Sequence, residues 1–80
     1  MIELLRHLDE IHTTPMGYER IKKNLNVNLD HEGILSLCKE KIVNQDATLY
    51  QKGKNRYCKI EGIIITINAH SYTLITAHQL

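Results

Sequence analysis

The last third of the chain has the strongest pattern of apolar and polar positions. Residues 63–67 consist of four isoleucines and Thr66, and the segment at 72–78 is again rich in β-branched residues. Two such runs around a short polar break at residues 68–71 are typical of a β-hairpin. Because the isoleucine run is the largest apolar block in the sequence, we expect the rest of the chain to cover one face of this hairpin or to extend it sideways.

Two shorter segments before the hairpin also have the composition of strands. They cover residues 48–52 and 55–60 and are joined by Gly53-Lys54, and Glu61-Gly62 joins the second of them to the isoleucine run. A glycine in each joint permits the positive φ that tight hairpin turns require. The pattern therefore predicts four antiparallel strands that follow one another in chain order.

The first half of the chain has apolar residues at helical spacing. The spacing predicts helices over residues 2–12, 15–25 and 31–44. Thr14, which precedes a proline, and Asp30 are the predicted N-caps of the second and third helices.

This order of elements predicts one α+β domain over residues 1–80. Three short N-terminal helices, within residues 1–45, would pack on one face of a four-stranded antiparallel β-meander formed by residues 47–79. A chain of this length buries only a thin core, so little stability is held in reserve.

Two-residue turns would fix which residues face each other across the strands. The predicted pairs are Ile60 with Ile63, Leu49 with Cys58, Cys58 with Ile65, Ile67 with Tyr72, and Ile65 with Leu74. These side chains are apolar, so their face should pack on the helices, and alternation places the polar residues on the opposite face. The polar rows are Tyr50, Tyr57, Thr66 and Thr73, and beside them Lys52, Asn55, Asn68 and Ser71. A four-residue loop between the last two strands would change the last pairing and move Thr73.

Charge and composition add a mild indication of the partner. With 42% apolar and 24% charged residues, the chain is ordinary for a globular domain. Residues 1–50 hold six Lys/Arg against eight Asp/Glu, a net −2, whereas residues 51–80 hold four against one, a net +3. The basic strand region points to an anionic partner, and no stretch is apolar enough to suggest a membrane partner.

The two cysteines and the start of the chain bear on localisation. Cys38 and Cys58 both lie in apolar patterns, which favours buried thiols in a reducing cytoplasm. The first residues lack a basic lead followed by a long apolar stretch, so we see no signal peptide. A cytoplasmic protein is therefore expected.

Candidate chemistry is limited to a few side chains. Five histidines are present, but no spacing resembles a metal site, and no phosphate loop or nucleophile elbow occurs, so neither a metal nor another cofactor is expected. Cleavage of RNA through its own 2′-OH needs a base, an acid and cationic or hydroxyl donors around the phosphate. His12, His78 and the basic, hydroxyl-rich sheet could supply them. A surface or packing role is the simpler interpretation of each histidine, as is cross-strand packing of Tyr50 and Tyr57 rather than base stacking.

Several motifs spread over nearly the whole chain carry a resemblance. They are His12-Thr13-Thr14, Gly17, Arg20-Ile21-Lys22-Lys23-Asn24-Leu25, Gly53-Lys54-Asn55-Arg56-Tyr57, Ile65-Thr66-Ile67-Asn68, Ser71-Tyr72-Thr73 and Ile75-Thr76-Ala77-His78. With them the chain resembles a family of small bacterial proteins classed as a domain of unknown function. That name implies no activity.

A looser resemblance is to the barnase–EndoU–colicin–RelE superfamily of metal-independent ribonucleases. It rests on helices that precede the sheet, a histidine near the first helix and Lys/Arg residues on the strands. The resemblance implies that His12 is the base or acid, that Lys52 or Arg56 clamps the phosphate, and that Thr73, Thr76 or His78 is the second polar group. We therefore expect His12, Lys52, Thr73 and His78 to be the catalytic residues. The residues expected to bind nucleic acid are Tyr50, Lys54, Arg56, Tyr57, Lys59 and Thr66. The predicted register, however, places Arg56, Thr76 and His78 on the helix side.

Two hypotheses for function result. The first is a small, toxin-like ribonuclease that acts without metal on RNA, tRNA included, through the open sheet face. The alternative is a non-catalytic binding module, such as a phage- or mobile-element-borne inhibitor or regulator of a protein or protein–nucleic acid complex. The modest charge favours the alternative, because RNA-binding faces are usually more basic. A homodimer formed through an exposed sheet or helix is a third option.

Overall fold

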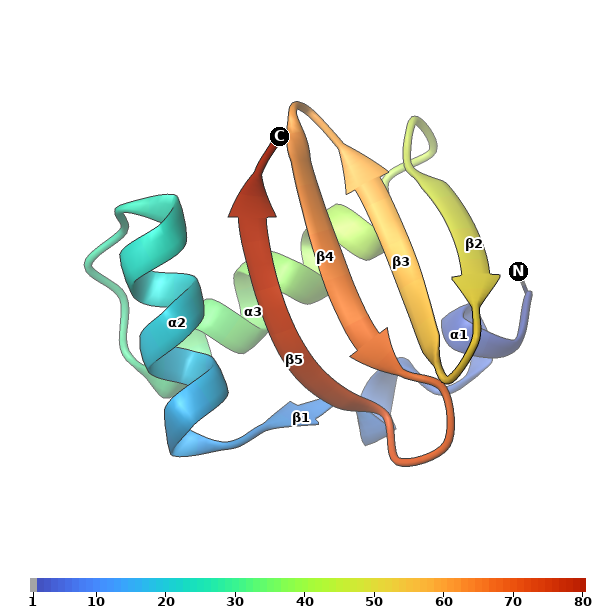
Figure 1. Ribbon diagram of the computed structural model, residues 1–80, viewed down its shortest axis with the longest axis horizontal. Coiled ribbons are helices and arrows are strands. Elements are labelled where there is room, and N and C mark those ends of the chain that lie inside the picture. The colour runs from blue at the N-terminus through green and yellow to red at the C-terminus, as the bar shows by residue number, and fades with distance from the viewer. Residues whose placement is uncertain (1) are drawn as a thin grey trace.

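Five strands form one mixed sheet in the order β1-β5-β4-β3-β2 (Figure 1). The structure is a computed structural model that describes residues 2–80, with side chains from Leu4 onward. The strands are β1 (His12–Thr13), β2 (Thr48–Lys52), β3 (Asn55–Ile60), β4 (Ile63–Asn68) and β5 (Thr73–Gln79). The predicted antiparallel meander corresponds to β2–β5, but the prediction of four strands is wrong, because β1 adds a short parallel strand beside β5.

The first predicted helix is divided into two short helices, and the predicted helices do not all pack on the same face of the sheet. They are α1 (Ile2–Arg6), the 3-10 helix η1 (Leu8–Glu10), α2 (Pro15–Leu25) and α3 (His31–Ile42). A single helix over residues 2–12 is therefore wrong. Figure 1 shows α3 crossing one face of the sheet and α2 lying beside β5, so the opposite sheet face is open.

Both predicted N-caps are confirmed. The Thr14 side chain accepts a hydrogen bond from the Gly17 amide at 3.1 Å, and Asp30 does the same for Gly33 at 2.8 Å. Each cap satisfies one of the amides that a helix N-terminus leaves without an internal partner. Because α2 starts directly after β1, its cap also fixes the direction of the chain that carries His12.

The core lies between α3 and the inner face of the sheet. Its fully buried large side chains are Leu4, Ile21, Ile34, Cys38, Ile42, Cys58, Ile65, Ile67 and Leu74. Odd-numbered isoleucines of β4 thus face inward, as the alternation predicts. The three predicted pairs Ile60–Ile63, Leu49–Cys58 and Cys58–Ile65 are confirmed.

The register of the last hairpin differs from the prediction for two reasons. The connection between β4 and β5 has four residues, 69–72, rather than two, and a β-bulge interrupts the ladder. Ile67 therefore pairs with Leu74 instead of Tyr72, and Ile65 pairs with Ala77 instead of Leu74.

The bulge also changes the face on which the end of β5 presents its side chains. A one-residue slip moves every later side chain to the other face of a strand. Thr76 pairs with Thr66 and His78 pairs with Ile64, so both lie on the open face, and their predicted place on the helix side is wrong. Thr76 also takes the position in the tyrosine–threonine row that was predicted for Thr73.

Candidate functional site

His12 and Thr73 lie side by side where β1 meets the start of β5. They are paired across the two parallel strands, and His12 Nε2 is 3.2 Å from Thr73 Oγ1. The other ring nitrogen, Nδ1, is 2.9 Å from the Glu10 carbonyl oxygen. Thr73 Oγ1 is in turn 2.7 Å from Ser71 Oγ. These four groups form the candidate site.

The Glu10 carbonyl determines the direction of this hydrogen-bond chain. A carbonyl oxygen can only accept, so Nδ1 of His12 carries the hydrogen and donates it. In the neutral imidazole, Nε2 then holds the lone pair and accepts from the Thr73 hydroxyl, whose oxygen can accept from Ser71. The arrangement presents His12 Nε2 as a proton acceptor at an exposed position beside two hydroxyl groups.

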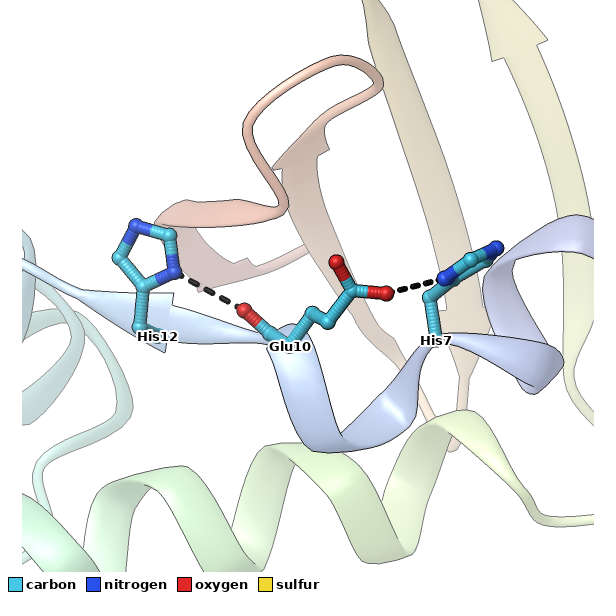
Figure 2. Close-up of polar contacts among 3 residues, drawn as sticks. All are labelled: His7, Glu10 and His12. Atoms are coloured by element: carbon cyan, nitrogen blue, oxygen red, sulfur yellow. Dashed lines mark hydrogen bonds and ion pairs between the residues drawn. The ribbon is translucent and has the colours of Figure 1, made fainter.

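Glu10 contacts two histidines through different groups, as Figure 2 shows. Its main-chain carbonyl holds His12, and its carboxylate forms an ion pair with Nδ1 of His7. The His7 ring packs on the Tyr72 ring, with centroids 4.9 Å apart. The short helix η1 therefore anchors His12 at one end and the loop before β5 at the other.

The loop between β4 and β5 brings Ser71 and Thr73 to His12. Asn68 Oδ1 accepts from the amides of His70 and Ser71, both at 2.9 Å. Tyr72 adopts a left-handed conformation with φ 58°, and its carbonyl accepts from the His12 amide at 3.2 Å. A non-glycine residue in this conformation costs free energy, and such residues concentrate at functional sites.

A close contact behind the site holds β1 against β5. Thr13 is buried and donates from Oγ1 to the Leu74 carbonyl at 2.8 Å. The Cα of Gly17 packs so tightly here that an added Cβ would lie 2.6 Å from Thr13 Oγ1 and 3.0 Å from the Leu74 carbonyl oxygen. Only glycine allows α2 to approach β5 this closely, and this approach fixes the strand that carries His12.

The open sheet face carries most of the predicted RNA-binding residues. Tyr50 and Tyr57 are paired and their rings stack with centroids 5.2 Å apart. Lys59 Nζ lies 5.7 Å from the centre of the Tyr50 ring. Thr66 lies between Tyr57 and Thr76 and is largely buried, with 7% of its surface exposed. Cross-strand packing therefore covers part of both tyrosine rings and most of Thr66.

Two of the four predicted catalytic residues lie together and two lie elsewhere. Lys52 is on β2, at the other edge of the sheet, which is about 19 Å from β1 for four strand spacings. His78 is near the far end of β5, about 16 Å from Thr73 at the rise of an extended strand. Neither can reach a phosphate group held at His12 without a large movement. Lys54 is closer to the loop, because its carbonyl accepts from the Ala69 amide at 2.8 Å.

Arg56 lies on the helix side, as the register predicted, since it pairs with Ile67. Its guanidinium carbon is 6.0 Å from the centre of the Tyr72 ring. Its Nε and Nη1 atoms are buried and have no hydrogen-bond partner among the described residues. Arg56 thus supports the loop from behind rather than facing the open surface.

Sequence reasoning did not assign roles to Glu10 and did not place Ser71 next to His12. The signal for Ser71 was the polar break after Asn68, whose side chain forms the loop through two amides. Glu10 gave no signal, because its contribution to His12 is a main-chain carbonyl.

The described residues form neither a surface pocket nor a metal cluster at the site. Within residues 2–80 no surface pocket is present, and no three His, Cys, Asp or Glu residues there lie close enough to hold a metal ion. None of the described helices is both long enough and apolar enough to cross a membrane. Cys38 and Cys58 are buried on the inner side of the sheet, where burial raises the pKa of Cys38 to about 12 and that of Cys58 to about 11.

Comparison with known proteins gives a family but no activity. The family model described as "Protein of unknown function (DUF3781)" matches residues 5–78. No curated protein and no solved structure matches the chain. The chain therefore belongs to this family, which confirms the resemblance to a family of unknown function.

Proposed function

We propose that this member of the family binds single-stranded RNA across the open sheet face and cleaves it at His12 by a reaction that uses the RNA's own 2′-OH. The observation that supports the proposal is the hydrogen-bond chain from the Glu10 carbonyl through His12 and Thr73 to Ser71. It leaves a proton acceptor and two hydroxyl donors together at an accessible edge. General acid–base catalysis requires a base within hydrogen-bond reach of the proton it removes.

The proposed step is a transesterification. The 2′-OH replaces the Thr73 hydroxyl at His12 Nε2 and gives its proton to that nitrogen, while the 2′-oxygen attacks the adjacent phosphorus. The bond from phosphorus to the 5′-oxygen breaks, and the leaving 5′-oxygen takes a proton from water. The products are a 2′,3′-cyclic phosphate and a 5′-hydroxyl, and His12 returns its proton to water. Thr73 and Ser71 donate hydrogen bonds to the phosphate oxygens as charge develops.

The rest of the RNA would follow the open face toward β2. Lys52, Lys54 and Lys59 lie exposed along this path, and the half-buried ring of Tyr57, stacked on Tyr50, is where a base would stack. Lysine contacts to phosphates would make binding weaken with salt, by a log–log slope of about 0.7 per phosphate on a single strand. Stacking on an aromatic ring contributes about 1–3 kcal/mol per base.

One observation favours the non-catalytic alternative. Lys52 and His78 are both far from His12, and no lysine or arginine of the described residues forms a hydrogen bond with the side chains of His12 or Thr73. A protein of this kind could still act as an inhibitor or regulator that binds a protein–nucleic acid complex through the same face. Binding without cleavage is the result that would support this alternative.

The test uses a labelled single-stranded oligonucleotide with one ribonucleotide in a DNA background, incubated with the purified protein and EDTA. We expect a cut only at the ribonucleotide, with a 2′,3′-cyclic phosphate end. His12→Ala should lower the rate by at least about 100-fold, and Thr73→Val by less. His31→Ala, an exposed histidine at the start of α3, is the matched control and should leave the rate unchanged. Intact RNA, total tRNA included, or equal cutting by His12→Ala would overturn the catalytic proposal.

A further inference from the structure

The two edges of the sheet differ in what lies beside them. On one side β1 pairs with the start of β5, and α2 lies along the rest of that strand (Figure 1). On the other side β2 is the last strand, and no other strand of residues 2–80 pairs with its outer edge. An uncovered strand edge is a template for another strand unless the protein blocks it.

The turn after β2 shows which of its backbone groups point outward. Gly53 has φ 62°, which fits a two-residue hairpin turn closed by Lys52 and Asn55. In such a hairpin the closing pair exchanges hydrogen bonds, and the hydrogen-bonded positions then alternate along the ladder. Lys52, Tyr50 and Thr48 therefore bond to β3, whereas the amides and carbonyls of Leu49 and Gln51 face outward. Neither residue has a backbone hydrogen bond in a turn or loop within residues 2–80.

The edge of β2 lacks the usual devices that prevent pairing. It contains no proline, and its ladder with β3 runs without a bulge over all five residues. Its one charge, Lys52, is at the end of the strand rather than in its middle. A regular edge of this length, with its one charge at the end and no strand paired beside it, is suited to strand addition.

We propose that a second copy of this chain pairs with β2 in antiparallel orientation about a two-fold axis at Tyr50. The outward groups of Leu49 in one copy then meet those of Gln51 in the other, which gives four backbone hydrogen bonds. Lys52 lies opposite Thr48 of the second copy, so no like charges face each other. The strand is self-complementary in this register, which is why a second copy fits the edge better than an unrelated strand.

The tyrosines give the pairing a further contribution. At the axis the two Tyr50 residues form a non-hydrogen-bonded pair, with Cα atoms about 4.5 Å apart, where side chains approach most closely. Each Tyr50 already stacks on its own Tyr57, so four rings would form one continuous row across the dimer. The axis is perpendicular to the sheet, so the open faces of both copies lie on the same side. The proposal does not depend on catalysis at His12.

The test is sedimentation of the full chain from about 10 µM to about 1 mM, because pairing along one short edge is a small interface of the size found in weak complexes. We expect the mass to rise from 9.3 kDa toward twice that value as concentration increases. Gln51→Pro removes one outward amide while leaving the bonds to β3 in place, and it should remain a monomer. Gln51→Ala keeps that amide and should associate as the natural chain does.

A second measurement does not depend on any variant. Hydrogen exchange of the Leu49 and Gln51 amides in the unmodified chain should slow with increasing concentration, while the Tyr50 amide, which already bonds to β3, should change little. A monomer at every concentration, or unchanged exchange at Leu49 and Gln51 in an associated sample, would overturn the proposal. Association of folded Gln51→Pro equal to that of Gln51→Ala would also overturn it.

Discussion

Replacement of Gly17 by alanine tests whether the close approach of α2 to β5 stabilises the fold and positions His12. The added Cβ would lie 2.6 Å from Thr13 Oγ1, 3.0 Å from the Leu74 carbonyl oxygen and 3.3 Å from the Ile75 carbonyl oxygen. Two of these atoms belong to the backbone of β5 and cannot rotate away. The helix must therefore shift outward, or the buried hydrogen bond from Thr13 must break.

The size of the effect follows from two opposing contributions. Overpacking of a well-packed site costs about 1–3 kcal/mol, whereas alanine in place of glycine in a helix gains about 0.5–1 kcal/mol. We expect a net loss of about 1 kcal/mol in the free energy of unfolding, which lowers Tm by about 4–8 °C in a domain of this size. Urea and thermal unfolding followed by circular dichroism would measure it.

Gly33→Ala is the matched control for Gly17→Ala. Gly33 occupies the equivalent position of α3, three residues after the Asp30 cap, but its added Cβ would meet only side-chain atoms of Asp30 and Leu29, at 3.1 Å or more. At these distances the exposed Asp30 and Leu29 need to shift by only a few tenths of an ångström, which can lengthen the cap hydrogen bond slightly, so this variant should lose less stability than Gly17→Ala and be close to neutral. A stability of Gly17→Ala equal to or above that of the natural chain, or an equal loss in Gly33→Ala, would refute the reasoning.

Three further predictions concern single contacts. Thr13→Val should destabilise by about 1–2 kcal/mol in urea unfolding, because it removes the buried bond to a β5 carbonyl, and Thr13→Ser should not. Glu61→Asn should stabilise by about 0.5 kcal/mol in the same assay, because asparagine tolerates the left-handed φ of 50° there and the lost ion pair with Lys41 is exposed. Cys38 and Cys58, whose pKa values are raised above 9.0 to about 12 and about 11, should react with a thiol reagent at pH 8 only on unfolding. Because the pKa of each thiol is higher in the folded than in the unfolded chain, the unfolded chain ionises first as the pH rises above 9. The free energy of unfolding, and with it the urea midpoint, should therefore fall between pH 9 and pH 12.

The sequence predicted the sheet where local chemistry decides the pairing. Both two-residue turns contain a glycine with positive φ, at Gly53 and Gly62, and the ladders on either side of β3 have the predicted register. The same holds for the caps at Thr14 and Asp30, where the side chain bonds an amide three residues away. In each case the interaction that fixes the structure is formed by residues within a few positions of the residue that predicted it.

The predictions that were wrong concern segments whose structure depends on contacts with residues distant in the sequence. β1 has two residues and no strand pattern of its own; its pairing depends on Thr13, which reaches a carbonyl 61 positions later in the chain. The helix predicted over residues 2–12 breaks because His7 and Leu8 pack against the sheet and its last loop. The bulge at Ile75 was likewise not predicted, although two apolar residues, Leu74 and Ile75, stand between Thr73 and Thr76 and interrupt the alternation. Alternation predicts faces only while the ladder is regular.

The bulge and the loop together determine which polar groups reach the open face. In a regular strand Thr73 and Thr76, three residues apart, would point to opposite faces. Because the bulge adds one residue between them, both point to the open face, where Thr73 meets His12 and Thr76 lies 3.4 Å from the Asn24 amide of α2. Thr73 lies before the bulge, so its place in the candidate site follows from the loop and from its pairing with His12, whereas the bulge brings Thr76 and His78 to the same face. A left-handed Tyr72 in the loop that brings Ser71 and Thr73 to His12 is more readily explained by a function at this edge than by the stability of the fold.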